Sequence, residues 1–360
     1  MKIILDNIIF SLQRVGGVSI YWSELLKRFL RDQILVNVIE AKNTNKNFCR
    51  DKINIPIDQI WRDTRPISIA RYLPALVKNK KMELFHSSYY RKSSLDFVPS
   101  IQTCYDFTYE RFRKGPSQWI HSIQKKQAIT AASGIICISE NTRKDLLYYF
   151  PNIKKENTCV IHLGYSSDFR YLSKKKAMRL IYPYIKFDNP FSLFVGERKG
   201  YKNFFLTVDA ISLYRNHRLV FVGGGSLSKY ENEYLNCKLK NRWVHIEYAP
   251  NILLNAIYNC AHAFIYPSSY EGFGIPIIEA MITGCPVIAL NSSSVPEVAA
   301  NGGILIDDAN ASTIYQKLKK LENSTLRKDI FERAIINAKR FSWERCYKQT
   351  LSFYSKILNK

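Results

Sequence analysis

The sequence lacks the features that define several large classes of protein. Its eight cysteines are scattered without a C-x-x-C pair, so neither a disulfide framework nor a zinc site of that kind is expected. No stretch approaches the roughly 20 consecutive apolar residues needed to span a bilayer. The first residues, MKIILDNIIF, do not resemble a secretory signal, because Asp6 and Asn7 interrupt the apolar run. We therefore expect a cytoplasmic protein with reduced thiols.

Acidic residues are scarce beside basic ones. Lys and Arg number 53 against 30 Asp and Glu, and of the net charge of +23, residues 1–187 carry +17 and residues 188–360 carry +6. A basic amino-terminal half favours nucleic acid, anionic lipid or phosphorylated substrates. No recognisable nucleic-acid-binding module accompanies the charge, so no nucleic-acid partner is expected. Segment 67–81 mixes apolar and basic residues. This pattern predicts either an interfacial helix on an anionic membrane surface or a helix that covers the core and has a solvated face.

The length and composition fit two globular domains. The chain has 360 residues, of which 46% are hydrophobic and 23% charged. Strand patterns alternate with helical patterns, which indicates an α/β fold with parallel sheets. We predict a Rossmann-like domain over residues 1–170, a linker over 171–189, a second Rossmann-like domain over 190–340 and a helix over 341–360. Ligands of such sheets bind at the carboxyl ends of the strands.

Two adjacent glycines follow the first predicted strand. The pattern predicts a strand over residues 2–12, a turn at Gly16 and Gly17, and an amphipathic helix over residues 19–32. A strand, a Gly-Gly turn and a helix in succession leave free N–H groups that suit a phosphate.

A second glycine-containing loop, residues 268–281, follows another apolar strand. Gly272 and Gly274 permit a tight turn and close approach to a ligand, ahead of a helix whose first N–H groups suit a phosphate. Glu271 and Glu279 are placed to accept hydrogen bonds from the hydroxyls of a sugar or ribose. For Glu279 alone, an exposed helix position is the simpler interpretation.

These stretches resemble a known family. Residues 271–281 look like the E-x7-E signature of the retaining, GT-B type glycosyltransferases of family 4, the mannosyltransferase-like group 1. The resemblance covers essentially the whole chain and is strongest over residues 193–298. The other matching stretches are RVGGV (14–18), CISENT (137–142), IHLG (161–164), VGERKGYKNF (195–204), VGGG (222–225), YPS (266–268), GCPV (284–287) and SSSVPE (292–297).

The resemblance implies a GT-B fold: two Rossmann-like domains facing a cleft, with the carboxyl-terminal helix crossing back to the first domain. It implies a retaining hexosyltransferase that uses a nucleotide-diphosphate sugar, GDP being favoured over UDP by the similarity to mannosyl-type members. The expected reaction is front-side attack in which the leaving phosphate assists deprotonation of the acceptor. The expected acceptor is a glycan, lipid-linked, in O-antigen or capsule synthesis at the cytoplasmic face of a membrane.

The resemblance also assigns roles to individual residues. Arg198 and Lys202 would bind the diphosphate, since fixed cations oppose the charge that grows on the leaving group, although a surface ion pair is the alternative for both. Glu271 would contact the donor sugar and Glu279 the ribose. The other donor-site residues are Gly16, Gly17, Gly196, Gly223, Gly224, Gly272, Phe273, Gly274 and Ile275. No Asp-x-Asp pair follows a strand, so neither a metal nor a cofactor is expected.

One position departs from the family pattern. Family members often carry a His-Asp pair after a strand of the first domain, and the resemblance implies that this His contacts the donor sugar. This chain has Tyr105 and Asp106 there, and the resemblance places both among the expected catalytic residues. A tyrosine titrates near pH 10 and is a poor base at neutral pH, so we expect an altered donor sugar, such as a deoxy or amino hexose, or a shifted role for nearby residues. His86, which follows another predicted strand, is a candidate for the acceptor side, with a structural role as the alternative.

Three alternative functions remain open on the sequence. A nucleotide-sugar epimerase and a phosphorylase both use this fold, and the fit of the Arg198 and Glu271 loops argues against them. An inactive GT-B scaffold is the third, because Tyr105 departs from the pattern. The nucleotide base, the sugar, the acceptor, the linkage and the oligomeric state are not fixed by these residues.

Overall fold

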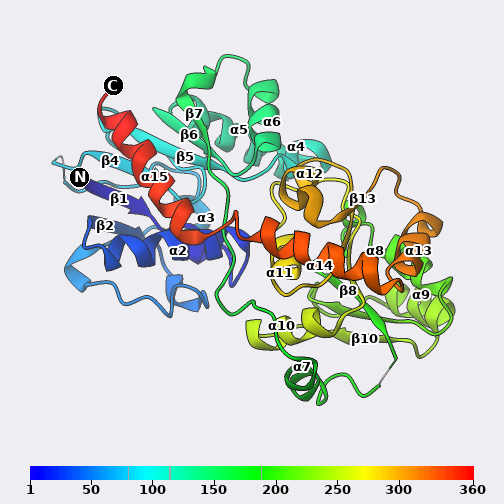
Figure 1. Cartoon of the computed structure of the whole chain (residues 1–360). Coiled ribbons are helices and arrows are strands. Elements are labelled where there is room, and N and C mark those ends of the chain that lie inside the picture. Colours follow the sequence, from blue (N-terminus) through cyan, green and yellow to red (C-terminus); the bar gives the residue numbers. More distant parts are fainter. Residues whose placement is uncertain (80, 113–114, 188) are drawn as a thin grey trace. The chain divides into compact units, whose positions relative to one another are not determined.

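The computed structural model describes residues 1–79, 81–112, 115–187 and 189–360. The chain forms two compact units, both of which are drawn in Figure 1. The first unit contains residues 1–164 and 342–360, and the second contains residues 165–341. The carboxyl-terminal residues therefore return to the unit in which the chain begins.

The described part of the first unit is built on a seven-stranded parallel sheet of order β3-β2-β1-β4-β5-β6-β7. The strands are β1 (Lys2–Asp6), β2 (Leu35–Glu40), β3 (Ile60–Arg62), β4 (Leu84–Ser87), β5 (Ser100–Cys104), β6 (Gly134–Cys137) and β7 (Thr158–Val160). The helices are α1 (Ile9–Leu12), α2 (Gly17–Arg31), α3 (Ile67–Ala70), α4 (Thr108–Phe112), α5 (Pro116–Thr130), α6 (Glu140–Tyr149) and α15 (Trp343–Leu358). Short 3₁₀ turns occupy Thr44–Lys46, Ile57–Gln59 and Lys155–Asn157.

The described part of the second unit is built on a six-stranded parallel sheet of order β10-β9-β8-β11-β12-β13. The strands are β8 (Phe191–Val195), β9 (Arg218–Val222), β10 (Trp243–Ile246), β11 (Ala263–Tyr266), β12 (Val287–Leu290) and β13 (Ile304–Ile306). The helices are α7 (Lys174–Ile181), α8 (Phe204–Ser212), α9 (Lys229–Leu239), α10 (Asn251–Cys260), α11 (Ile275–Ile282), α12 (Val295–Ala299), α13 (Ala311–Lys320) and α14 (Ser324–Ala338). Two 3₁₀ turns, Gly200–Lys202 and Ala300–Gly302, complete it.

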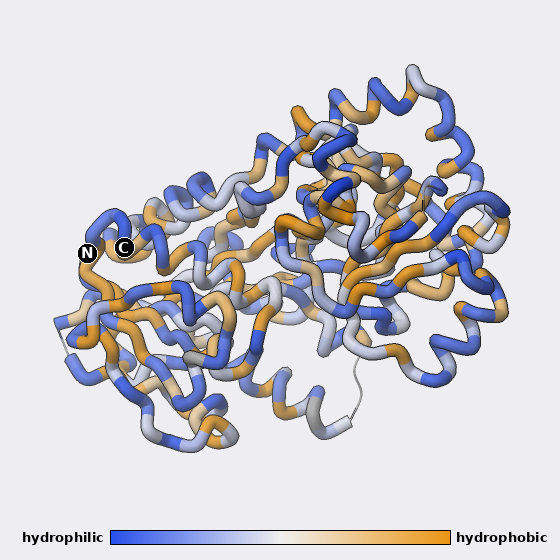
Figure 2. The backbone as a smooth tube through the Cα atoms, turned by 90° about the horizontal axis from the view of Figure 1, so that it is seen from below, coloured by the Kyte–Doolittle hydropathy of each residue, from blue (hydrophilic) through white to orange (hydrophobic). Residues whose placement is uncertain are grey.

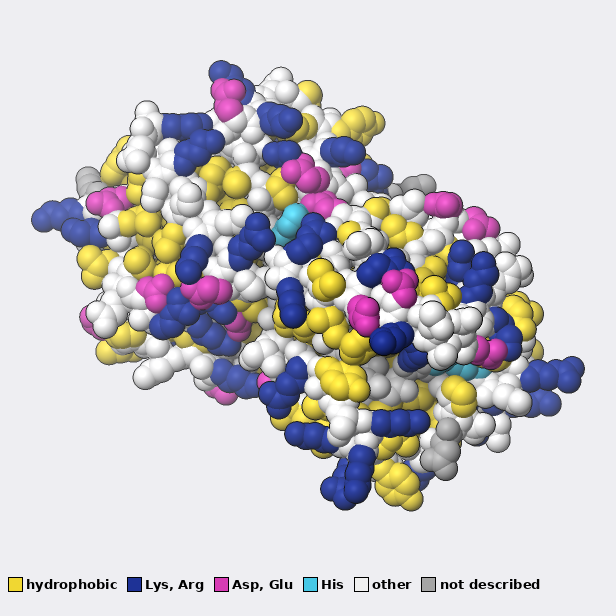
Figure 3. Space-filling model, in the orientation of Figure 1, with side chains coloured by type: hydrophobic (Ala, Val, Ile, Leu, Met, Phe, Trp, Pro, Cys, Tyr) yellow, Lys and Arg dark blue, Asp and Glu magenta, His cyan; other side chains and the backbone are white. Residues whose placement is uncertain are grey.

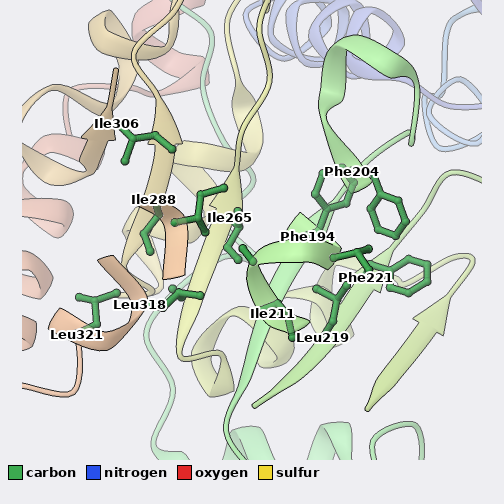
Figure 4. Packing of buried hydrophobic residues seen from close by; sticks show 14 of the residues in the cluster. Phe194, Phe204, Ile211, Leu219, Phe221, Ile265, Ile288, Ile306, Leu318 and Leu321 are labelled. Carbon is green, nitrogen blue, oxygen red and sulfur yellow. The ribbon is translucent and has the colours of Figure 1, made fainter. Parts of the chain in front are cut away.

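The predicted α/β class, with two Rossmann-like parallel sheets, is confirmed. Parallel strands are buried on both faces, which explains their continuous apolar sequences. In the second unit, the side chains of β8, β9, β11 and β12 pack with those of α8 and α13, and Figure 4 shows Phe194 of β8 and Phe221 of β9 beside Phe204 of α8. In Figure 2 the hydrophobic segments run along the strands inside each unit.

Three elements differ from the sequence-based expectation. The first strand ends at Asp6, and residues 9–12 form the short helix α1, because a short apolar run suits a buried strand and a buried helix equally. The segment expected as a linker over 171–189 contains α7. Segment 67–81 is not a long helix: α3 ends at Ala70, four residues before Pro74. Lys80, in the basic run of that segment, lies outside the described residues.

The segment around α7 belongs to the second unit through backbone contacts with α10. The amide of Arg170 donates to Asn255 Oδ1 at 3.0 Å, and the amide of Leu172 donates to Asn259 Oδ1 at 2.7 Å. Ala177 and Ile181 are the buried positions of α7, and its lysines lie on the exposed side. The helix has only eight residues and begins with three consecutive lysines, so the segment was interpreted from its basic composition as a linker.

Helix α15 packs on α2 in the first unit. The ring of Tyr354 stacks on Phe29 with centroids 6.0 Å apart, and Tyr347 meets the same ring edge-on at 5.3 Å. At its start, Glu344 pairs with Arg31 at 2.9 Å. No helix within the described residues is both long and apolar enough to cross a bilayer.

We predict that Gly164→Ala destabilises the first unit. A Cβ at Gly164 would lie 2.2 Å from the backbone nitrogen of Trp343, the first residue of α15, so the backbone has to move. Overpacking of this kind costs about 2 kcal/mol and lowers the melting temperature by several degrees. Gly200→Ala is the matched control, because a Cβ there meets nothing within 4 Å. Equal melting temperatures of the two variants would contradict the prediction.

Candidate functional site

The loops that carry the predicted donor-site residues of the second unit leave the same edge of its sheet. Strands β9, β8, β11 and β12 are consecutive neighbours in the sheet and run parallel. Gly196 follows β8, Gly223 follows β9, and Glu271 lies in the loop after β11. The carboxyl edge of such a sheet is where α/β proteins bind ligands.

Three consecutive serines after β12 hold the Glu271 loop in place. The hydroxyl of Ser292 donates to the carbonyl of Ser269 at 2.6 Å, and Ser293 Oγ accepts the amide hydrogen of Glu271 at 2.8 Å. The hydroxyl of Ser294 lies 2.9 Å from the carbonyls of both Glu271 and Phe273. These hydroxyls replace the backbone partners that the loop lacks, so its shape is fixed before any ligand binds.

Lys202 and Glu271 form an ion pair in which both side chains are largely buried. Lys202 ends a 3₁₀ turn, and the next residue, Asn203, takes a left-handed conformation with φ of 53°. The Asn203 side-chain amide donates to the carbonyl of Pro267 and to Ser269 Oγ, both at 2.8 Å. The two loops are therefore tied together at the point where the predicted cation and carboxylate meet.

Tyr266, at the end of β11, lies beneath this pair. Its ring centroid is 5.7 Å from Lys202 Nζ. Burial and the neighbouring carboxylate of Glu271 raise the pKa of Tyr266 well above its usual value, so its hydroxyl keeps its proton. The arrangement offers a cation for a phosphate and an ionised acceptor for a sugar hydroxyl.

The guanidinium of Arg198 is engaged by protein groups on all three nitrogens. Its side chain is 4% exposed, and Nε donates to Glu231 Oε1 at 2.7 Å. Nη1 donates to the carbonyl of Gly223 at 2.8 Å, and Nη2 lies 3.1 Å from the carbonyls of Gly225 and Ser226. The guanidinium thus holds the glycine loop after β9, and this geometry does not present it to a diphosphate.

The glycines of these loops adopt conformations that other residues avoid. Gly196, Gly223 and Gly224 have φ of 126°, 93° and 80°, and Gly274, which begins α11, has φ of 109°. A Cβ at Gly224 would lie 2.3 Å from Arg198 Nη1, so glycine is also needed for the guanidinium to fit. Gly272 and Phe273 precede α11, and Ile275 is its first residue; Pro276 has no N–H, and the Ile277 amide donates to the carbonyl of Gly274 at 3.0 Å.

Glu279 lies one turn into α11, with Tyr258 as its partner. The Tyr258 hydroxyl donates to Glu279 Oε2 at 3.4 Å. Burial raises the pKa of Glu279 to about 7. The simpler interpretation, an exposed helix glutamate, does not hold, because the side chain is partly enclosed and its charge is disfavoured.

In the first unit, Gly16 and Gly17 begin α2. The backbone of Gly16 is extended, with φ of 174°, and a Cβ there would lie 2.7 Å from Gln13 Oε1, so that side chain would have to move. A Cβ at Gly17 meets nothing within 4 Å. The hydroxyl of Ser19 donates back to the carbonyl of Gly16 at 2.9 Å. A role of this turn in phosphate binding stays a prediction.

Tyr105 is buried and cannot substitute directly for the family histidine. Its hydroxyl donates to the carbonyl of Ser88 at 3.0 Å, and its ring packs edge-on against Tyr21 at 5.9 Å. Burial raises its pKa well above the usual value. The neighbouring Asp106 is half-buried, and its Oδ1 accepts the amide hydrogen of Thr108 at 2.8 Å.

The acceptor role expected for His86 needs correction. The imidazole is fully buried: Nδ1 is bonded to the Tyr354 hydroxyl of α15, and Nε2 lies 2.9 Å from Thr103 Oγ1. Burial lowers its pKa to about 3. With both nitrogens engaged, His86 joins β4, β5 and α15 and has the structural role that the sequence left as the alternative.

Several residues of the site were not singled out by sequence reasoning. Ser292, Ser293 and Ser294 lay within a matching stretch but had no role, although three hydroxyls directly after a strand are a readable signal. Glu231 and Asn203 act through partners distant in the sequence, for which no local signal exists. Within the described residues, no group of three His, Cys, Asp or Glu side chains is arranged to hold a metal ion.

Comparison with known proteins agrees with this fold. The model of glycosyl transferases group 1 matches residues 184–340, and the model of glycosyltransferase family 4 matches residues 15–169. Together these matches cover most of the chain. The chain belongs to the GT-B glycosyltransferases.

Three relatives illustrate the similarity. The O-antigen chain mannosyltransferase B of Escherichia coli is 27% identical over 266 residues, which cover 71% of this chain and 68% of that protein. An uncharacterized glycosyltransferase of Methanocaldococcus jannaschii is 24% identical over 379 aligned positions, covering 99% of each chain. The crystal structure of HepE from Anabaena in complex with UDP-glucose has a TM-score of 0.72 at 15% identity, covering 99% of this glycosyltransferase and 100% of HepE.

We predict that Glu279 makes stability depend on pH. Its pKa is about 7 in the folded glycosyltransferase against an ordinary value of 4.5, so the folded state binds the proton more tightly. The contribution of Glu279 to the free energy of unfolding is largest below pH 4.5, falls as the pH rises and is lost above about pH 7. Each pKa unit corresponds to about 1.4 kcal/mol, reduced here because the side chain is only partly enclosed.

The measurement is thermal unfolding between pH 5 and pH 8. Glu279→Gln removes the titration, so its melting temperature should rise relative to that of the wild type across this range. Glu332→Gln on α14, an exposed helix position, is the control and should follow the wild type at every pH. Parallel plots of melting temperature against pH for Glu279→Gln and the wild type would show that burial does not shift the pKa of this carboxyl group.

Proposed function

We propose that this protein is a retaining hexosyltransferase that transfers a sugar from a nucleotide-diphosphate donor to a hydroxyl of a glycan acceptor. The observation that carries the proposal is the Lys202–Glu271 pair, held between two rigid loops at the carboxyl edge of the second unit's sheet. Lys202 would bind the diphosphate, and Glu271 would accept hydrogen bonds from the donor sugar. Donor binding exchanges this ion pair for contacts with the ligand.

The proposed reaction is front-side attack. The bond between the anomeric carbon and the diphosphate oxygen breaks, and a bond from that carbon to the acceptor oxygen forms on the same face. The acceptor proton passes to the departing phosphate oxygen, and the configuration is retained. Lys202 and the amides that begin α11 oppose the charge that develops on the leaving group, so we propose that no metal is required.

The geometry supports different roles for the two predicted cations. Arg198 holds the glycine loop after β9 through Glu231 and three carbonyls, so we propose that it positions the phosphate-binding backbone. The remaining donor contacts would come from that backbone, from Gly272 to Ile275 and from Glu279 at the ribose. We prefer guanine as the base of the donor nucleotide, because the chain is similar to mannosyl-type members. The HepE structure contains UDP-glucose, so both GDP and UDP are included in the test.

We further propose that the acceptor is lipid-linked, in O-antigen or capsule synthesis at the cytoplasmic face of a membrane. The support is a surface of the first unit formed by Trp119, Ile120 and Ile123 on the outer side of α5, with Trp119 72% exposed. Gln124 Nε2 is bonded to the carbonyl of Arg71, which places a second exposed apolar stretch beside α5. That stretch contains Ile69, Tyr72, Leu73 and Leu76.

Basic residues accompany this surface. Arg71 lies within it, Lys126 is exposed on α5, and Lys92 is exposed on the strand-like segment bonded to Ala75. Figure 3 shows basic side chains distributed over one face of the molecule, with acidic ones fewer. Exposed apolar side chains with a basic surround suit an anionic membrane surface.

We predict that nucleoside diphosphates stabilise the protein through Lys202. Ligand at 100 times its dissociation constant adds about 2.7 kcal/mol to the native state. Melting temperatures are measured with GDP, UDP and ADP, with magnesium or with EDTA. We expect GDP to raise the melting temperature equally with magnesium and with EDTA. Lys202→Ala should abolish this rise. Lys229→Ala, which changes an exposed lysine of α9, should keep it.

The other outcomes are equally informative. Arg198→Ala should lower the melting temperature without nucleotide, because Glu231 and three carbonyls lose their partner. A rise in melting temperature with UDP alone would change the proposed donor nucleotide to UDP and leave the proposed mechanism unchanged. No shift with any nucleotide contradicts the transferase and favours an inactive scaffold, and release of diphosphate without an acceptor favours an epimerase.

We predict that the α5 surface binds anionic vesicles. The wild type should float with vesicles containing phosphatidylglycerol at low salt, and less with phosphatidylcholine alone. Trp119→Ser combined with Ile123→Ser should reduce flotation about tenfold, since burial of large apolar side chains dominates such binding. Tyr148→Ser on α6, at a position 78% exposed, is the control. Flotation that does not respond to the double variant would remove α5 from the proposal.

A further inference from the structure

A buried polar cluster lies at the carboxyl edge of the first unit's sheet, on the inner side of α5. Tyr89 follows β4 by two residues and Asp106 follows β5 by two. Helix α4 contributes Glu110, and α5 contributes His121, Gln124 and Lys125. We call these six residues the His121 cluster. Only Asp106 was singled out in the sequence, and the other five residues have no part in the donor site described above.

The cluster is rigid. The Tyr89 hydroxyl lies 3.0 Å from His121 Nε2, and the Tyr109 ring stacks on the imidazole at 4.0 Å. Lys125 Nζ donates to the carbonyl of Asp106 at 2.5 Å and to Glu110 Oε2 at 3.3 Å. Each side chain is fixed by at least one neighbour from another element, as a preformed binding site requires.

Three atoms of the cluster are buried without a hydrogen-bond partner. They are His121 Nδ1, Glu110 Oε1 and Gln124 Oε1, and Arg71 Nε beside them is a fourth. His121 and Gln124 are each 8% exposed. Buried polar atoms in folded proteins are paired in the great majority of cases, so four orphans in one place call for a ligand.

The chemistry of these atoms selects the ligand. Two are carbonyl or carboxylate oxygens that only accept, one is a guanidinium nitrogen that only donates, and the imidazole nitrogen does either. An anion would be repelled by Glu110 and Asp106, and an apolar group would leave all four unpaired. Hydroxyls both donate and accept, so a polyhydroxylated ligand satisfies the set.

We propose that the His121 cluster binds a sugar ring of the acceptor through its hydroxyls, with His121 Nδ1 and the oxygens of Glu110 and Gln124 as the contacts. This inference rests on the proposed transferase function and names the acceptor subsite. The pKa of His121 is lowered to about 4 by burial and by the nearby charge of Lys125, so the imidazole is neutral at pH 7. When the Tyr89 hydroxyl donates to Nε2, Nδ1 carries the hydrogen and donates to the ligand.

The cluster also accounts for the departure at Tyr105. The hydroxyl of Tyr105 is bonded to the carbonyl of Ser88 inside the fold, so that position offers nothing to a ligand. His121 supplies an imidazole at the same edge of the sheet from a neighbouring helix. The chain thus has a neutral imidazole at the edge where Asp106 lies, although the residue directly after β5 is a tyrosine.

The first test uses imidazole NMR signals of the full-length protein labelled with ¹⁵N-histidine. The chain has six histidines, and His121→Gln identifies the signal of His121. Methyl α-D-mannopyranoside and methyl α-D-glucopyranoside are titrated to about 100 mM, a range that suits millimolar binding, and GDP and UDP are titrated separately. We expect at least one pyranoside to shift the His121 signal and the signals of His217, His245 and His262 to stay fixed.

Tyr89→Phe provides a second variant that keeps the ring and removes the hydroxyl bonded to Nε2. It should weaken the pyranoside response of His121 about threefold to tenfold, as loss of one hydrogen bond does. Unchanged signals of the other histidines show that each variant is folded. No shift of His121 with either pyranoside at the highest concentration, or an equal shift in Tyr89→Phe, overturns the proposal.

Kinetics separates this inference from the proposed function. With a glycan acceptor that supports transfer, His121→Gln should raise the acceptor KM about tenfold and leave the donor KM unchanged. An unchanged acceptor KM overturns the subsite. If nucleotides fail to bind but pyranosides still shift His121, the transferase proposal fails while the saccharide site stands.

Discussion

The loops at the carboxyl edge of the second unit's sheet are held by side chains that bond their backbone. A parallel sheet leaves the ends of its strands without ladder partners, so the connecting loops need other donors and acceptors. Arg198 supplies donors to the loop after β9, and Ser292 to Ser294 bond the loop after β11. Because these clamps are in place before a ligand arrives, the phosphate-binding backbone does not have to be ordered during the reaction.

The same constraint is met in a different way in the first unit. Below β1 to β3, Arg91 donates to both Asp6 and Asp63 at 2.9 Å, and all three side chains are buried. The charges of this network are paired among its own members. Asp63 also lines a hollow together with Glu40, Arg50 and Arg62. The part of the edge beside β4 and β5 differs, since the unpaired atoms of the His121 cluster lie there.

Sequence patterns predicted what is encoded locally and missed what depends on distant partners. The strand Ala263–Tyr266 and the glycine turn after it were predicted because apolar runs and glycines act on their own neighbours. The role of His86 was not, since its partner Tyr354 is 268 residues away, and the enclosure of Arg198 was not, since Glu231 is 33 residues away. Helix α7 was missed because it is short and basic, and its composition was interpreted as that of a linker although its apolar positions are periodic.

Helix α5 connects the two proposals made for the first unit. Its inner side carries His121, Gln124 and Lys125, and its outer side carries Trp119, Ile120 and Ile123. A helix with its side chains is about 10 Å across, so a lipid surface on one side and a sugar-binding cluster on the other lie within reach of a short glycan. A lipid-linked acceptor needs this proximity, because its carrier stays in the membrane while its terminal hydroxyl enters the protein. Polar residues on the inner side of α5 are followed by the buried apolar residues Ala128 and Ile129, so it is the part of the helix before Ala128 that places polar groups inward and large apolar groups outward. This local arrangement is accounted for if both sides of this part bind ligands.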